Sequence, residues 1–344
     1  MTTGPLNAIT DVPGVLVGHH HRFEDGWATG TTVVLTPAGA TGGVDQRGGA
    51  PGTRETDLLA PQNLVQQAHG VCLSGGSAYG LAAADGVMRW LAEHEHGFPV
   101  GSQPHEVVPI VPAAVIFDLP NSAWGNRPDA EFGYAACQAA AAGPVTQGCV
   151  GAGVGATVGS LSGGVGTASR ITAAGFTVGA LAVVNAAGEA VDFATGRPWA
   201  ADHELSGEFG VPAWPNRPAQ QPSVPDPPLN TTIGVVATDA ELTKAECHRL
   251  AMSAQDGLAR AVRPAHSMFD GDTVFALATG DRELTSATGP FAQQTRAAVL
   301  DELCAAAAEA FTRAIVHGTL RASALPGRPA YRDLWPGAVK DGQE

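Results

Sequence analysis

Runs of β-branched apolar residues alternate along the chain with segments of helical periodicity, and this alternation predicts an α/β fold. Short runs rich in Thr, Val and Ile, bounded by Gly, Pro or polar residues, are typical of strands. They predict strands over residues 31–36, 108–118, 176–184, 231–238 and 273–279. Apolar positions three and four residues apart predict helices over residues 79–94, 129–142, 242–262 and 291–320, the last of them long enough for one helix or two.

A proline-rich stretch at residues 211–228 ends just before one of these strands. Its last prolines exclude a helix there: Pro218, Pro222, Pro225, Pro227 and Pro228. Asn230-Thr231-Thr232 follows and leads into the strand. A threonine at such a junction can act as a nucleophile once the bond before it is cut, because the freed α-amine, with a pKa of about 7.7–8.0, takes the hydroxyl proton. Taken alone, these three residues favour an ordinary strand start over a nucleophile.

Composition predicts a soluble globular protein whose partners are neither membranes nor nucleic acids. The 344 residues suffice for one large domain or two, and with 44% hydrophobic but only 6% aromatic residues the core must consist mainly of Ala, Val and Leu. A net charge of −14 argues against nucleic acid and anionic membranes. No spanning apolar stretch or basic signal segment is recognisable. Five scattered cysteines without a CxxC pair favour reduced thiols in the cytoplasm and no structural zinc.

Several motifs in a fixed order resemble one family of hydrolases. Asn230-Thr231-Thr232-Ile233, a helix, and then Asp270-Gly271-Asp272-Thr273 are joined by earlier blocks at residues 9–15, 45–57, 73–80, 108–112 and 184–186. Over nearly its whole length the chain resembles the L-aminopeptidase/D-esterase family, which includes β-aminopeptidases and nylon-oligomer hydrolases. The resemblance implies a four-layered αββα sandwich of the self-processing N-terminal-nucleophile type. It also implies one structural domain over residues 1–344 and a homotetramer.

The resemblance assigns roles to individual residues. Cleavage between Asn230 and Thr231 would give a 1–230 chain and a 231–344 chain. Thr231 would be the nucleophile, Asn185 would hold the oxyanion, and Asp270 and Asp272 would orient the amine and hydroxyl. The expected substrates are small peptides, amino-acid amides or esters, and related amide oligomers, with no metal or organic cofactor. Taken without the resemblance, the two aspartates fit a solvated turn or a calcium-like loop, and Asn185 fits a polar turn.

Four further residues are candidates for the substrate pocket. Ser74 and Tyr79 come from the block at 73–80, which leads into a predicted helix, and Ser160 and Ser162 follow the glycine-rich segment 151–156. Two departures from the family concern catalysis and the binding of the substrate amine. No lysine precedes Lys244, although some members of the family have a catalytic lysine near the glycine-rich segment. Residues 112–117, where β-aminopeptidases have a glutamate that binds the substrate amine, include no acidic residue before Asp118. Strict aminopeptidase specificity is therefore not expected.

Two other functional classes remain open. An uncleaved, non-enzymatic relative could use the same fold to bind a small molecule. A cofactor-binding α/β protein could use the glycines at 151–156, although no acidic residue stands about 20 positions on as a dinucleotide fingerprint requires. A metal site at residues 19–21, three consecutive histidines, is disfavoured because neighbouring residues of a strand point to opposite faces.

Overall fold

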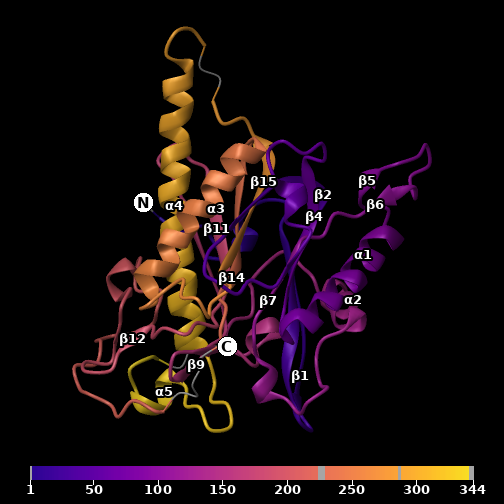
Figure 1. Cartoon of the computed structure of the whole chain (residues 1–344). Helices are drawn as coiled ribbons and strands as arrows, with labels where there is room; N and C mark the ends of the chain where they lie inside the picture. Colours follow the sequence, from indigo (N-terminus) through magenta and orange to yellow (C-terminus); the bar gives the residue numbers. More distant parts are fainter. Residues whose placement is uncertain (1, 224–228, 286–287, 341–344) are drawn as a thin grey trace.

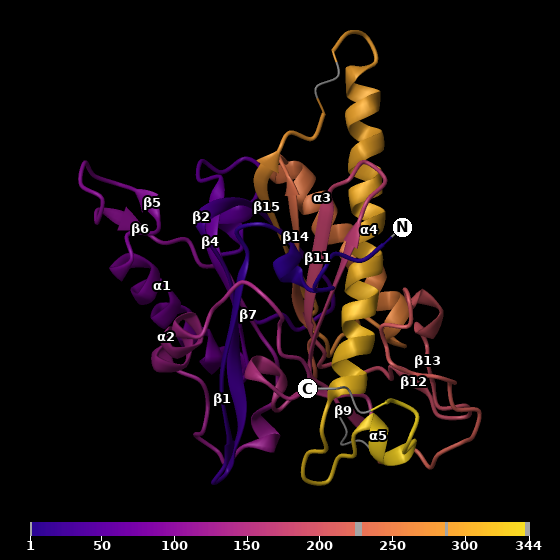
Figure 2. The same ribbon diagram turned by 180° about the vertical axis from the view of Figure 1, so that it is seen from behind.

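Four layers, in the order helix, sheet, sheet, helix, make up the fold in the computed structural model, which describes residues 2–223, 229–285 and 288–340 (Figure 1). Helices α3 (Lys244–Ala261) and α4 (Ala292–Arg321) cover one outer face, and α1 (Ala83–Glu93) and α2 (Ala130–Gln138) cover the other. Figure 2 shows the same layers from behind. The predicted αββα sandwich is confirmed.

One strand, β2 (Trp27–Gln46), takes part in both inner layers. Its first half pairs with β1 (Leu16–Glu24) and β4 (Gln67–Ser74), and its second half pairs with β15 (Thr273–Arg282). The register shifts between Leu35 and Ala40, where Gly39 has a φ of +85°. The path runs β10 (Val165–Ile171), β11 (Thr177–Val183), β14 (Ile233–Ala240), β15, β2, β4, β7 (Ala113–Val115), β3 (Thr53–Arg54). One hydrogen-bonded ladder of nine strands, β1 included, therefore bends into two packed sheets.

Alternating side chains along the strands build separate cores on the two faces of each sheet. Val34 and Val235 lie in the core between the sheets. Their neighbours Val33 and Val236 point outward, Val33 toward α1 and Val236 toward α3 and α4. This is the period of two that a strand with both faces buried requires.

Most of the predicted elements are present. The strands predicted over 31–36, 176–184, 231–238 and 273–279 correspond to β2, β11, β14 and β15, and the helices over 242–262 and 291–320 to α3 and a single α4. The segment 79–94 starts as a 3-10 helix, Ser77–Ala82, and continues as α1, while 129–142 contains the shorter α2.

The strand predicted over 108–118 is wrong. Only Val107–Val108 and Ala113–Val115 are strand, because Pro109 and Pro112 have no N–H to donate to a ladder. The remaining short elements are β5 (Phe98–Pro99), β6 (Val107–Val108), β8 (Thr157–Val158), β9 (Leu161–Ser162), β12 (Val191–Asp192), β13 (Arg197–Pro198) and α5 (Tyr331–Leu334). Within the described residues, no helix combines the length and apolar character needed to cross a bilayer.

The unit β14–α3–β15 sets the position of the candidate residues. Strands β14 and β15 are parallel, with Ile233 opposite Thr273, so both strands begin at the same edge of the sheet, and α3 supplies the crossover that a parallel pair needs. Strand β11 runs antiparallel to β14 and ends at that edge, where Val183 pairs with Ile233. On the other side β15 pairs with β2, so β14 and β15 lie between two strands that both precede Thr231 in the chain.

Candidate active site

Thr231 lies at the edge where β14 and β15 begin and β11 ends, and the other predicted residues meet it there. Its N–H donates to the backbone carbonyl of Asn185 at 2.7 Å. Asn230 forms a parallel bridge with Asp270, and the next N–H, that of Thr232, donates to the Asp272 carboxylate at 2.8 Å. All of these residues are buried.

The hydroxyl of Thr231 is held beside the peptide bond that precedes it. Its Oγ1 donates to the carbonyl oxygen of Asn230 at 2.5 Å and accepts from the Gly271 N–H at 3.2 Å. A Cβ on Gly271 would lie 2.4 Å from the backbone oxygen of Ala50, so the Asp-Gly-Asp turn needs glycine for this close approach. The neighbouring hydroxyl of Thr232 is buried and has no hydrogen-bond partner in the described part of the chain. Of the two threonines, Thr231 is thus the one whose hydroxyl faces a peptide carbonyl.

Asp272 anchors the backbone just after Thr231. Its Oδ1 accepts from the Thr232 N–H, and its Oδ2 accepts from His266 twice, from the backbone N–H at 3.2 Å and from the ring Nδ1 at 2.8 Å. Burial raises the pKa of Asp272, the hydrogen bond from His266 lowers it, and the nearby Asp270 raises it. The carboxylate is thus linked to Thr231 through the backbone of Thr232 and not through the Thr231 hydroxyl, which is bonded to Asn230 and Gly271.

Asp270 joins two turns on either side of Thr231. One oxygen accepts from the Ala187 N–H at 3.1 Å, and the other accepts from Ser267, from its N–H at 2.9 Å and its hydroxyl at 2.5 Å. Ala187 follows directly on the segment that carries Asn185. Asp270 therefore fixes the end of β11 against the start of β15.

Asn185 has a fully buried side chain that is only partly used in hydrogen bonding. Its Oδ1 accepts from the Thr157 N–H at 2.9 Å, while its Nδ2 donates to the carbonyl of Phe117 at 3.4 Å, a long and weak bond. Its main-chain oxygen holds the Thr231 N–H. An amide N–H with so weak a partner is available to a new acceptor next to Thr231.

A cavity of about 270 Å³ opens in front of Thr231. Its wall comes from four regions: the segment 50–52, the start of the 3-10 helix at Ser77 and Ala78, the segment 115–117, and Leu229 to Thr231 with Phe269. Of the described residues that line it, none is ionisable. The cavity therefore favours a neutral group next to the Thr231 hydroxyl.

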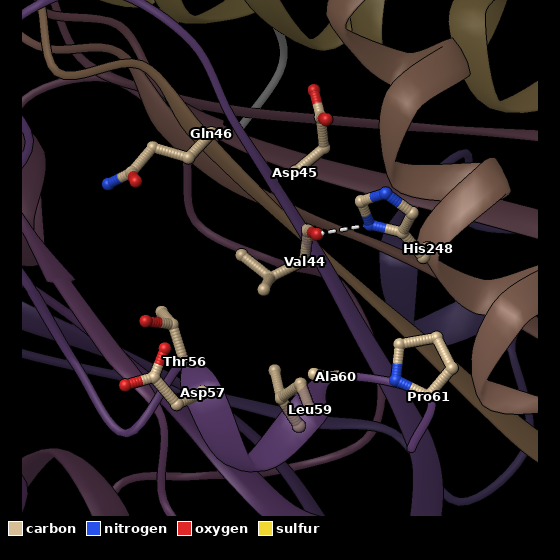
Figure 3. A pocket seen from close by; sticks show the side chains of 9 residues that line it. All are labelled: Val44, Asp45, Gln46, Thr56, Asp57, Leu59, Ala60, Pro61 and His248. Carbon is tan, nitrogen blue, oxygen red and sulfur yellow. Dashed lines mark hydrogen bonds between the residues drawn. The ribbon is translucent and has the colours of Figure 1, made fainter. Parts of the chain in front are cut away.

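A second cavity, of about 350 Å³, lies between the end of β2, the segment 56–61 and His248 of α3. Figure 3 shows Asp45 and His248 on one side of it and Thr56 and Asp57 on the other, with His248 Nδ1 donating to the Val44 carbonyl at 2.6 Å. Among residues 2–223, 229–285 and 288–340, no cluster of three or more His, Cys, Asp or Glu side chains suits a metal ion. This cavity is consequently not a candidate metal centre.

Comparison with known proteins identifies the family. The model of peptidase family S58 matches residues 7–332. The chain belongs to peptidase family S58. It is 54% identical to an uncharacterized aminopeptidase of Mycobacterium tuberculosis, a match that covers 97% of this chain and 99% of the relative. It is 33% identical to a 6-aminohexanoate-oligomer endohydrolase of Paenarthrobacter ureafaciens, over 81% of this chain and 77% of that protein.

Solved structures of similar fold support the architecture of this family member. A beta-aminopeptidase of Burkholderia sp. superposes with a TM-score of 0.68 at 27% identity, covering 96% of this chain and 92% of that chain. An L-aminopeptidase D-ala-esterase/amidase of Ochrobactrum anthropi, whose fold is described as a variant of the Ntn hydrolase fold, superposes with a TM-score of 0.70 at 24% identity, covering 95% and 90%. The predicted resemblance is confirmed.

Membership of a peptidase family confirms the predicted enzyme class, a hydrolase of amide or peptide bonds. The alternative of a dinucleotide-binding protein is wrong. The glycine-rich segment forms a three-residue 3-10 helix, Gly151–Gly153, followed by the short strand β8, and not the strand–turn–helix that a dinucleotide site needs.

The four predicted pocket residues lie outside the cavity. The Ser74 hydroxyl is bonded to Thr31 Oγ1 at 2.9 Å, and the Tyr79 ring lies under the Arg127 guanidinium, 3.7 Å from it. The Ser160 N–H and hydroxyl both donate to one oxygen of Glu189. The Ser162 hydroxyl donates to the Arg328 carbonyl at 3.2 Å. These side chains fix loops around the site, and only Ser77 and Ala78, next to Tyr79, reach the cavity.

His266 and Ser267 bind Asp272 and Asp270 and were not among the site residues predicted from the sequence. Ser267 stands three residues before Asp270, a spacing typical of a turn closed by side chains, and could have been found from it. His266 adopts a left-handed backbone with a φ of +57°, and no spacing in the sequence indicates its bond to Asp272.

A buried carboxylate beside the cavity gives a testable pH dependence of stability. Asp118 accepts from the Thr29 hydroxyl and the Gly76 N–H, both at 2.6 Å, and so fixes the turn before Ser77. Burial raises the pKa of Asp118 from its ordinary 3.8 to about 6, against these two hydrogen bonds, which lower it. Since the folded-state pKa is the higher one, this group's contribution to stability is complete below about pH 4 and is lost as the pH rises through 6.

We expect Asp118→Asn to gain stability relative to the unchanged protein as the pH rises. An amide at this position can accept from Gly76 and donate to Thr29, and it carries no buried charge. The difference in free energy of unfolding should shift in favour of the variant by about 2 kcal/mol between about pH 4.5 and pH 8. Urea denaturation at both pH values measures it. A difference in free energy of unfolding that does not change with pH would contradict the raised pKa of Asp118.

Proposed function

We propose that this chain is a self-processing hydrolase of amides that uses Thr231 as an N-terminal nucleophile. The observation that carries the proposal is the position of the Thr231 hydroxyl, at hydrogen-bond distance from the carbonyl of the peptide bond that would be cut. The Gly271 N–H donates to Thr231 Oγ1 and so restricts rotation of the Thr231 side chain.

The proposed first step is intramolecular. Thr231 Oγ1 adds to the carbonyl carbon of Asn230, the C–N bond breaks, and the hydroxyl proton passes to the departing nitrogen, which becomes the α-amine of Thr231. The Asn230 acyl group is then an ester of Thr231, and water hydrolyses this ester to give a 1–230 chain and a 231–344 chain. Asn185, with its weakly bonded Nδ2, is the proposed donor to the oxyanion, an interaction that can contribute roughly 3 kcal/mol.

The second part of the proposal is turnover of an external substrate. The α-amine of Thr231 remains next to the Asn185 carbonyl, and Asp272 and Asp270 hold the two turns around it. Its pKa of about 7.7–8.0 in the unperturbed state lets it accept the hydroxyl proton and return it to the leaving amine. The same oxygen thereby takes the acyl group of a small peptide, an amino-acid amide or ester, or an amide oligomer.

No lysine takes part in this scheme. Lys244, the first lysine of the chain, donates its Nζ to the carbonyls of Leu58, Asn63 and Val65 and is thus engaged elsewhere. The names of the relatives, an aminopeptidase and an oligomer endohydrolase, support amide substrates that are cut either next to a free amino terminus or at an internal amide bond. The homotetramer, the cytoplasmic location and the extent of the single domain stay predictions.

Mass spectrometry of the freshly purified protein under denaturing conditions tests the proposal. We expect two polypeptides, one ending at Asn230 and one beginning at Thr231, together with hydrolysis of amino-acid anilides. A single full-length species that is stable for days and hydrolyses none of them would contradict it. That outcome would favour the alternative of a non-enzymatic binding protein.

A further inference from the structure

The segment that precedes Thr231 occupies the place that a substrate's acyl group must take. During self-processing the acyl donor is Asn230, whose carbonyl becomes the ester on Thr231. A substrate acyl-enzyme has its carbonyl on the same oxygen, because the hydroxyl and the oxyanion donors do not move between the two reactions. The contacts of Leu229 and Asn230 therefore describe the acyl subsite of the enzyme.

Asn230 is bound as a short extension of the sheet. Its backbone N–H donates to the Phe269 carbonyl at 3.3 Å, and the pair Asn230–Asp270 is a parallel bridge. Its side-chain Nδ2 donates to the buried Ala186 carbonyl at 2.6 Å. Both acceptors are main-chain oxygens that remain when the acyl group has left, and a buried carbonyl such as that of Ala186 costs about 1–3 kcal/mol when it has no donor. An acyl group with an amide N–H in the same place restores the first of these bonds.

The charge of the subsite also favours a neutral, acylated nitrogen over a free ammonium. Phe269 borders the cavity, and the described residues that line it include no carboxylate to pair with an ammonium. A free α-ammonium at the position of the Asn230 nitrogen would be desolvated without a counter-charge. An acylated nitrogen in that place is neutral and still donates one hydrogen bond to Phe269.

We infer that the enzyme prefers substrates whose reacting residue is itself N-acylated, so that it cuts amide bonds inside a neutral, extended chain and not after a free amino terminus. The inference rests on the proposed function and names the substrate class of the same site. The chain N-terminal to the cut binds as an added strand beside Phe269 and Asp270, in the way that peptides extend sheet edges. In the reaction the Thr231 hydroxyl displaces the amine, and water then releases the N-acyl acid.

Three chromogenic substrates that differ only at one nitrogen test the inference on the mature protein. They are N-acetyl-asparagine p-nitroanilide, the free-amine asparagine p-nitroanilide, and the N-acetyl-N-methyl analogue that lacks the N–H. We expect kcat/KM for the acetylated substrate to exceed that for each of the other two by about tenfold or more, because the N-methyl analogue loses the hydrogen bond to Phe269 and the free-amine substrate brings a charge into the subsite. The Thr231→Ala protein supplies the background rate.

The outcomes separate the inference from the function on which it rests. Faster cleavage of the free-amine substrate, or equal cleavage of the N-methyl analogue, would overturn the inference and leave the nucleophile in place. A cleaved chain that hydrolyses none of the three would also overturn it, because the self-substrate's own residue would then not define the subsite. An uncleaved chain without activity would overturn both.

Discussion

Thr231→Ala should yield a single 344-residue polypeptide with no measurable amide hydrolysis. Alanine removes the only hydroxyl that hydrogen-bonds to the Asn230 carbonyl in the described part of the chain, so neither the ester with Asn230 nor an ester with substrate can form. We expect the rates of both reactions to fall by roughly 10³-fold or more, as for other enzymes that lose their nucleophile. Intact mass spectrometry and an anilide assay measure the two effects.

A conservative variant serves as the control for this loss. Thr231→Ser keeps a hydroxyl at the same atom and should retain part of both activities. The thermal unfolding of Thr231→Ala should stay near that of the unchanged protein, because the side chain lost is small and its neighbour Gly271 loses one long hydrogen bond. Normal chain scission in Thr231→Ala would rule this residue out as the nucleophile.

Asp272→Asn should slow both reactions by roughly 10²-fold, since small displacements of a nucleophile can have effects of that size. The carboxylate accepts three N–H groups, one from Thr232 and two from His266. An amide offers one oxygen, so its own NH₂ must face at least one of these donors. The strand start, with Thr231, would move. The buried mismatch should also lower the free energy of unfolding by about 1–3 kcal/mol.

A matched variant separates the position of the carboxylate from the loss of a negative charge. Asp57→Asn removes an exposed carboxylate beside the second cavity and should leave scission, hydrolysis and stability unchanged (Figure 3). Time courses of scission at 25 °C and urea denaturation of both variants provide the comparison. If Asp272→Asn processes as fast as Asp57→Asn, the anchoring role of Asp272 is wrong.

The fold could be predicted where the sequence pattern is local and continuous. Strands β11, β14 and β15 and helices α3 and α4 each have an uninterrupted period, and the order strand, helix, strand around Thr231 follows directly. The bend of β2 could not be predicted, because pairing of its two halves with different strands depends on contacts far apart in sequence. The false strand over 108–118 shows the limit of apolar runs, since Pro109 and Pro112 interrupt the ladder.

The candidate site was predictable to the extent that its residues stand at strand ends. Asn185 ends a strand, Thr231 precedes one and Asp272 precedes another, and a parallel pair with an antiparallel neighbour brings these three ends together. The orientation of the candidate pocket serines could not be predicted, because a hydroxyl near glycines gives no information on direction, and in the structure their hydrogen bonds fix loops. His266 and the main-chain acceptors Phe269 and Ala186 could be found only in three dimensions.

Strands β14 and β15 lie between β11 and β2, and this order has a consequence for renaturation. Scission at residue 230 would leave a small chain inserted between strands of a large chain, so the two should copurify and unfold together. Once denatured, however, they would no longer be tethered, and recovery would become a bimolecular step whose yield depends on protein concentration. The Thr231→Ala chain, still continuous, should refold at high dilution where the cut protein does not.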